Sequence, residues 1–93
     1  MPSETRTRLV VHGAVQGVGF RFAACEAAVE CSVVGWVRNL PDGSVEIVAQ
    51  GAPDAVARMT AWAQRGPRYA SVTHVQVEAL AGSSPLDAFE IRR

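Results

Sequence analysis

The sequence predicts a single α+β domain in which two helices cover one face of a four- to five-stranded, mainly antiparallel sheet. Three observations lead to this prediction: β-branched runs alternate with alanine-rich runs, a hairpin signal lies near the centre, and glycine or proline marks the junctions. The chain has 93 residues, 48% of them hydrophobic, which is enough for one modest core. We expect one domain over residues 1–93, with residues 1–6 forming a flexible N-terminal tail.

The first two elements flank a glycine-rich stretch. The run RLVVHG, residues 8–13, is rich in β-branched residues and indicates a strand. The alanine-rich segment 22–31 indicates a helix, which we expect to begin at Phe20 or Arg21. Apolar residues at helical spacing predict that its inward face carries Phe22, Cys25 and Ala28 or Val29.

The centre of the chain predicts a β-hairpin. Residues 33–39 and 45–51 indicate two strands, and Pro41-Asp42-Gly43 between them is a strong turn signal. Along the second strand, an apolar set of side chains alternates with a more polar set, which predicts one buried and one exposed face. The two sets are Val45, Ile47 and Ala49 on one side and Glu46, Val48 and Gln50 on the other.

The second half predicts another helix and one or two strands. Pro53 and Asp54 suit a helix start and Gly66-Pro67 suits its end, with an inward stripe of Val56, Met59, Trp62 and Ala63. Residues 71–79 indicate a strand, and the terminal AFEIRR, residues 88–93, adds a short one. The resulting order, β-α-β-β-α-β plus a terminal strand, is that of a ferredoxin-like α/β sandwich.

Charge and composition exclude several classes of protein. The formal net charge is zero, and all nine cationic side chains are arginine, so the broad basic surface of a nucleic-acid binder is not expected. No stretch approaches the roughly 20 apolar residues of a membrane span, and the N-terminus lacks an apolar signal region, which predicts a cytoplasmic protein. Cys25 and Cys31 lie about 240° apart on a helix, which disfavours a disulfide. We expect buried, reduced thiols and no zinc site.

The stretch HGAVQGVGFR, residues 12–21, carries most of the functional information. Its glycine spacing differs from that of the dinucleotide-binding fingerprint, and the absence of lysine excludes a nucleoside-triphosphate loop. Gly17 and Gly19 allow the backbone to turn so that successive N–H groups converge on an anion, next to a helix N-terminus and the Arg21 guanidinium. A phosphoryl group fits such donors. A tight strand-to-helix turn with a solvated Arg21 is an equally strong interpretation of these residues alone.

A second candidate residue, Asn39, ends a predicted strand at the mouth of the hairpin. Asparagine is frequent there as a simple turn residue. In this fold the strand end can also lie near the glycine-rich loop, where an amide group can hold a water molecule against a bound phosphoryl group.

Taken together, VHGAVQGVGFR and GWVRNLPDGSVE resemble the acylphosphatase family, whose members hydrolyse the carboxyl–phosphate bond of acyl phosphates. WAQRGPRYASVTHVQV and FEIR also match, so the resemblance extends from about Arg8 to Arg92. One position departs from the family pattern: Cys31-Ser32 stands where relatives usually have Leu-Gly. A non-glycine residue in a left-handed cap there typically costs about 1 kcal/mol.

The resemblance implies roles for individual residues. It implies that Arg21 binds the substrate phosphate, that Asn39 positions the attacking water, and that no metal or other cofactor is needed. It also implies a phosphate cradle made of the backbone amides of Gln16, Gly17, Val18, Gly19, Phe20 and Arg21. His12 and His74 are expected to be ordinary strand residues, so a phosphate oxygen of the substrate is the expected proton acceptor.

Two other classes of function compete with this one. An RNA-recognition module is disfavoured by the neutral charge and the 6% aromatic content. A non-catalytic phosphate- or carbamoyl-phosphate-binding module is the stronger alternative, because similar domains occur within the large carbamoyltransferase that matures hydrogenases. This chain lacks that protein's cysteine-rich segments, which favours a free-standing monomeric enzyme whose partner is a small acyl phosphate.

Overall fold

The computed structural model describes residues 4–81 and 86–92. Along the chain the elements are β1 (Thr5–Ala14), α1 (Phe20–Cys31), β2 (Val34–Asn39), β3 (Val45–Gly51), α2 (Pro53–Arg65), β4 (Ser71–Leu80) and β5 (Phe89–Ile91). β1 begins earlier than the predicted strand, at Thr5, so the expected tail is partly strand; residues 1–3 of it lie outside the described residues, as does Arg93 of the predicted terminal strand.

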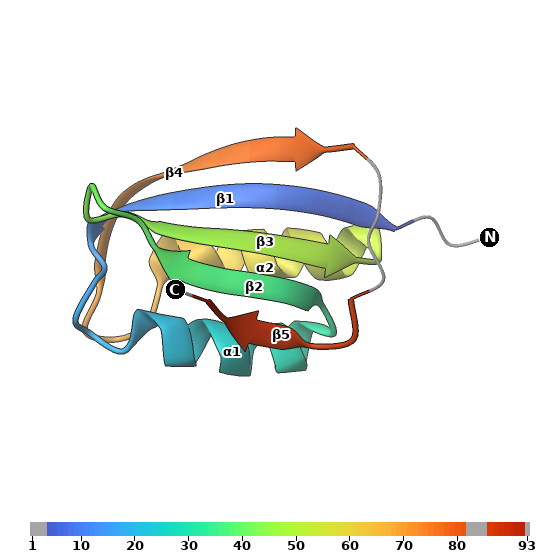
Figure 1. Ribbon diagram of the computed structural model, residues 1–93, viewed down its shortest axis with the longest axis horizontal. Helices are drawn as coiled ribbons and strands as arrows, with labels where there is room; N and C mark the ends of the chain where they lie inside the picture. Colours follow the sequence, from blue (N-terminus) through green and yellow to red (C-terminus); the bar gives the residue numbers. More distant parts are fainter. Residues whose placement is uncertain (1–3, 82–85, 93) are drawn as a thin grey trace.

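A single five-stranded sheet has the order β4-β1-β3-β2-β5, and both helices lie behind it on one face (Figure 1). β1, β2, β3 and β4 pair antiparallel with their neighbours, whereas β5 runs parallel to β2. The predicted ferredoxin-like fold is therefore confirmed. The pairing of β1 with β3 and of β3 with β2 brings the start of α1 and the end of β2 to the same end of the molecule (Figure 1).

The core lies between the sheet and the two helices. Leu9 and Val11 of β1 and Ile47 of β3 are fully buried there, and they meet Phe20 of α1 and Met59 of α2. Burying large apolar side chains contributes about 1.5–3 kcal/mol each. The predicted stripe of α2 is confirmed, with Val56, Met59 and Ala63 buried and Trp62 packed against the core.

The predicted inward face of α1 is confirmed at Ala28 and Cys25, which pack in or against the core, but it is wrong at Phe22. Its buried residues are Phe20, Ala24, Ala27 and Ala28, whereas Phe22 and Val29 are 73% and 77% exposed. Phe20 and Phe22 lie about 200° apart around a helix, so both cannot face the core. Alanine occupies many of the other positions of this helix and fits a buried or an exposed site equally well. The sequence therefore did not show which of the two phenylalanines faces the core.

Two further expectations need correction. β3 is buried along its whole length, including Glu46 and Gln50, because it is the central strand and long side chains cover its second face. Cys25 and Cys31 are free, as expected, but each is only partly buried. Burial still raises the pKa of the Cys25 thiol.

Neither helix in the described part of the chain has the length and apolar character to span a membrane.

Candidate active site

The loop between β1 and α1 depends on two glycines with left-handed backbone conformations. Gly17 has φ 78° and Gly19 has φ 76°, and Gly19 is the N-cap of α1. A Cβ atom added at either position would meet nothing within 4 Å. Glycine is therefore favoured here by the backbone conformation, which costs other residues roughly 1–2 kcal/mol, and not by lack of space.

The N-terminus of α1 points unpaired donors out of the helix. The first intrahelical hydrogen bond runs from the Ala23 N–H to the Gly19 carbonyl, at 3.1 Å. The N–H groups of Phe20, Arg21 and Phe22 precede it, so they have no carbonyl partner within the helix. Gly19 offers no capping side chain, and no acidic residue lies in the first turn. The positive end of the helix dipole is therefore free to attract an anion.

A cavity of about 130 Å³ opens at this helix end. It is lined by Val15, Gly17, Gly19, Phe20, Arg21, Phe22 and Asn39. The structure thus brings together Arg21 from the first turn of α1 and Asn39 from the end of β2, although 18 positions separate them in the sequence. Gln16 and Val18, two of the predicted loop residues, do not line the cavity.

The two polar side chains that line the cavity are those of Arg21 and Asn39. In residues 4–81 and 86–92, neither the Arg21 guanidinium nor the Asn39 side-chain amide has a hydrogen-bond or ion-pair partner. Both residues are half-buried. An arginine fork and an amide group held at one cavity without internal partners can both bind a small polar ligand.

Gln16 has a role that the sequence did not predict. Its side-chain amide donates hydrogen bonds of 2.8 Å to the backbone carbonyls of Leu40 and Ser44. These two bonds tie the glycine-rich loop to the β2–β3 hairpin, directly after Asn39. Gln16 was expected to contribute only its backbone N–H, and a long amide side chain in a loop facing a hairpin was the available signal.

The hairpin itself is fixed by Asp42. The hydroxyl and the backbone N–H of Ser44 both donate hydrogen bonds to the Asp42 carboxylate, and these bonds hold the pKa of Asp42 below its ordinary value. The turn that follows Asn39 is thereby closed from both sides, by Asp42 within the hairpin and by Gln16 from the loop.

His12 and His74 lie on neighbouring strands, away from the cavity. Their rings stack with centroids 4.3 Å apart, and His12 Nε2 lies 2.9 Å from Gln76 Oε1. Neither histidine lines the cavity, and its described lining includes no carboxyl or imidazole group. Among the residues described, no cluster of three or more His, Cys, Asp or Glu side chains could hold a metal ion.

Comparison with known proteins identifies the family. The acylphosphatase family model matches residues 7–91, nearly the whole chain. The chain belongs to the acylphosphatase family. The resemblance seen in the two motifs is therefore confirmed.

Individual acylphosphatases match over almost their full length. The acylphosphatase of Synechococcus sp. strain WH7803 is 47% identical over 87 residues, which are 94% of this chain and 86% of that protein. That of Anaeromyxobacter dehalogenans is 46% identical over 99% of both chains. The crystal structure of the Bacillus subtilis acylphosphatase superposes with a TM-score of 0.92 at 32% identity, covering 96% of this chain and 99% of that one.

Proposed function

We propose that this acylphosphatase-family chain hydrolyses the carboxyl–phosphate bond of an acyl phosphate, releasing a carboxylate and inorganic phosphate without the help of a metal ion. The observation that carries the proposal is the meeting of Arg21, Asn39 and the N-terminus of α1 at one small cavity. The names of the relatives, acylphosphatases with closely matching lengths, support the same reaction.

In this proposal the phosphoryl group lies against the loop. The cradle consists of backbone N–H groups within Gln16, Gly17, Val18, Gly19, Phe20 and Arg21, and the Arg21 guanidinium binds the same oxygens. Phosphoryl transfer spreads negative charge over the equatorial oxygens, where preorganised donors stabilise the transition state most. Gly17, Gly19, Phe20 and Arg21 line the cavity, so their N–H groups are the best-placed members of the cradle.

Asn39 then positions the attacking water. The water oxygen forms a bond to phosphorus while the bond from phosphorus to the bridging oxygen breaks, and the acyl group leaves as a carboxylate. A carboxylate leaves without being protonated, so no general acid is required. The proton of the water passes to a phosphate oxygen of the substrate, which agrees with a cavity lining that offers neither carboxyl nor imidazole.

Hydrolysis of acetyl phosphate by the purified protein tests the proposal, with and without EDTA. We expect turnover that EDTA does not change. A chain that binds inorganic phosphate but does not hydrolyse acetyl phosphate would be the binding module considered above, and inhibition by EDTA would refute the metal-free reaction.

Two substitutions test the assigned roles. We expect Arg21→Ala to lose about 10²–10³-fold in turnover and most of its affinity for inorganic phosphate, because a preorganised donor is removed. Asn39→Ala should lose turnover with a smaller change in phosphate affinity, because the amide acts on the water. Arg58→Ala is the matched control, since Arg58 is exposed on α2 and pairs with Asp54 at 3.2 Å. Activity of both test variants equal to that of the control contradicts the assignment.

A further inference from the structure

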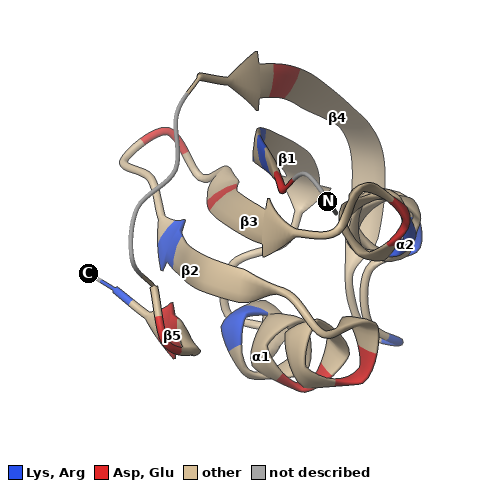
Figure 2. Cartoon of the chain, turned by 90° about the vertical axis from the view of Figure 1, so that its right-hand side faces the viewer, with Lys and Arg blue, Asp and Glu red and all other residues tan. Residues whose placement is uncertain are grey.

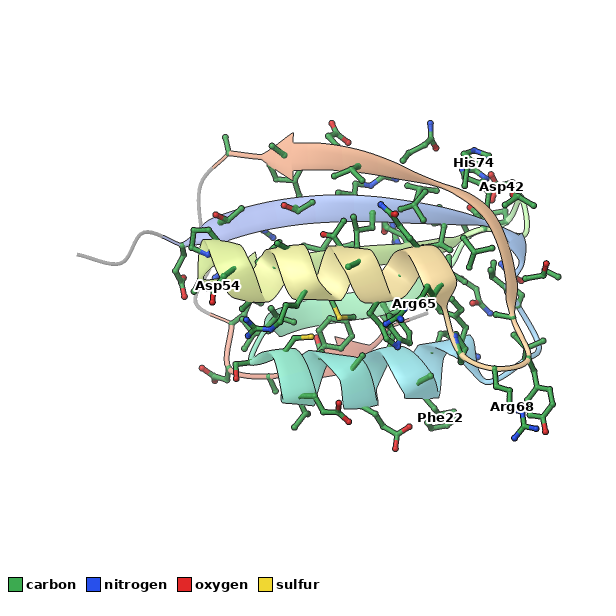
Figure 3. All side chains as sticks on the ribbon, turned by 180° about the vertical axis from the view of Figure 1, so that it is seen from behind. Phe22, Asp42, Asp54, Arg65, Arg68 and His74 are labelled. Atoms are coloured by element: carbon green, nitrogen blue, oxygen red, sulfur yellow. The ribbon has the colours of Figure 1, made fainter. Side chains whose placement is uncertain are left out.

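Phe22 is a large apolar side chain that lines the cavity from outside the core. It follows Arg21 directly and is 73% exposed. The other exposed large apolar side chains of the described residues are Val29, Tyr69, Val77 and Ile91, and none of them lines the cavity. Figure 3 shows Phe22 projecting outward from α1, at the opposite end of the molecule from Asp54.

The local structure explains why Phe22 faces outward. Phe20 is 1% exposed and packs against Trp62, with ring centroids 5.3 Å apart. The helical turn therefore directs Phe22, about 200° further round, away from the core. Its ring is held on the first turn of a helix, so an apolar surface stands beside the cationic end of the cavity.

The cavity is too small to enclose an acyl phosphate that carries a bulky acyl group. Its volume of about 130 Å³ lies below the roughly 300 Å³ at which pockets for larger ligands begin. The phosphoryl group fits inside, and the rest of the molecule must extend over the rim. Val15 and Phe20 are buried and form the floor, which leaves Phe22 as the exposed apolar surface of the rim.

We propose that Phe22 binds the acyl group of the substrate and that it favours acyl phosphates with an aromatic or other bulky apolar group over small ones. This inference rests on the proposed function. The acyl group of such a substrate covers the Phe22 ring and removes apolar surface of both partners from water. Aromatic rings gain a further contact by offset or edge-to-face packing.

Steady-state kinetics with benzoyl phosphate and acetyl phosphate test the inference. For Phe22→Ala we expect the ratio of KM for benzoyl phosphate to KM for acetyl phosphate to rise about three- to tenfold, the range of one aromatic contact. Phe22→Leu should give an intermediate ratio. Val29→Ala is the matched control on the same helix, because Val29 is also exposed and lies away from the cavity. Its ratio should equal that of the unmodified protein.

A second measurement separates this inference from the proposed function. Benzoylphosphonate and acetylphosphonate keep the acyl group but lack the scissile bridging oxygen, so their dissociation constants can be measured without turnover. A chain that hydrolyses neither acyl phosphate refutes the proposed function, while tighter binding of benzoylphosphonate that is lost in Phe22→Ala still supports the role of Phe22. Equal ratios and equal phosphonate affinities in Phe22→Ala and Val29→Ala overturn that role.

Discussion

Ser32 ends α1 in the left-handed conformation, with φ 62° and ψ 43°. Its N–H donates to the Val29 carbonyl at 3.2 Å, and the N–H of Val33 donates to the Ala28 carbonyl at 3.0 Å. This pair of bonds is a Schellman motif, in which glycine is the usual residue at the position of Ser32. Ser32 is the one non-glycine residue with positive φ in the described chain, so the strain expected from the sequence lies at this position.

Replacing that serine should therefore stabilise the protein. For Ser32→Gly we expect a gain of about 0.5–1 kcal/mol in the free energy of unfolding, because the relief of the left-handed strain exceeds the entropy that glycine adds to the unfolded chain. Urea denaturation measures the change. Ser71→Gly, in β4, is the control and should destabilise, because glycine weakens a strand. A loss of stability in Ser32→Gly would contradict the strain argument.

At the scale of elements, the sequence predicted the order and type of every helix and strand but not all of their faces. α2 has large apolar residues on one side, so its buried face was readable. α1 is rich in alanine, which fits either environment, and the sequence could not show that Phe20 points inward and Phe22 outward. The large apolar residues of a helix determine which of its faces packs against the core, and α1 has few of them.

The same limit applies to the site. Arg21, Asn39 and the two loop glycines were predicted from motif and backbone chemistry, and the structure places all four at one cavity. The position of Phe22 at the rim depends on the rotation of α1 about its axis. The side-chain hydrogen bonds of Gln16 depend on how the loop packs against the hairpin. Such contacts between segments distant in sequence require the packed fold.

The Gln16 link between loop and hairpin carries a prediction of its own. For Gln16→Ala we expect about tenfold lower kcat toward acetyl phosphate, because losing two hydrogen bonds of about 1 kcal/mol each lets Asn39 move relative to the loop. Inhibition by inorganic phosphate should change less, since the loop donors remain. Gln64→Ala, exposed near the end of α2, is the control. A phosphate affinity that falls as much as kcat would indicate general loss of structure rather than positioning by Gln16.

At the scale of the whole molecule, the sheet face opposite the helices is protected by charged side chains. Glu46 of β3 is 3% exposed and lies between Arg8 of β1 and Arg38 of β2, with an Nε–Oε1 distance of 2.6 Å to Arg38. Figure 2 shows the acidic position of β3 between basic positions of its two neighbours. Arg38 and Arg92 also lie near the ring of Trp36. The stems of Arg8 and Arg38, which both reach Glu46, cover β3, and this explains why a strand with alternating polar residues is buried on both faces.

Breaking this cluster should destabilise the whole fold. For Glu46→Gln we expect a loss of roughly 1–3 kcal/mol, because two arginines lose their anion while the amide keeps some of the packing. Glu78→Gln is the matched control, since the exposed Glu78 pairs with Arg8 at 3.6 Å and should contribute less than about 1 kcal/mol. Urea denaturation of both variants measures the difference. Equal losses would mean that burial of Glu46 adds nothing to the strength of its pairs.

The positive φ of Gly17 and Gly19 leads to opposite expectations for D- and L-amino acids at these positions. Apart from the Arg21 guanidinium, the proposed phosphate ligands are main-chain N–H groups. An ordinary side-chain substitution does not remove these groups, but a change of backbone conformation displaces them. A D-amino acid prefers positive φ, so a D-alanine at Gly17 matches the backbone conformation found there. A synthetic segment carrying Gly17→D-Ala, ligated at Cys25, should keep turnover and gain about 0.4–1 kcal/mol, as removal of glycine freedom does elsewhere. Gly17→L-Ala should lose both stability and turnover, because an L residue disfavours positive φ. The comparison of the two alanines therefore shows whether the loop requires glycine for its backbone conformation or for lack of space.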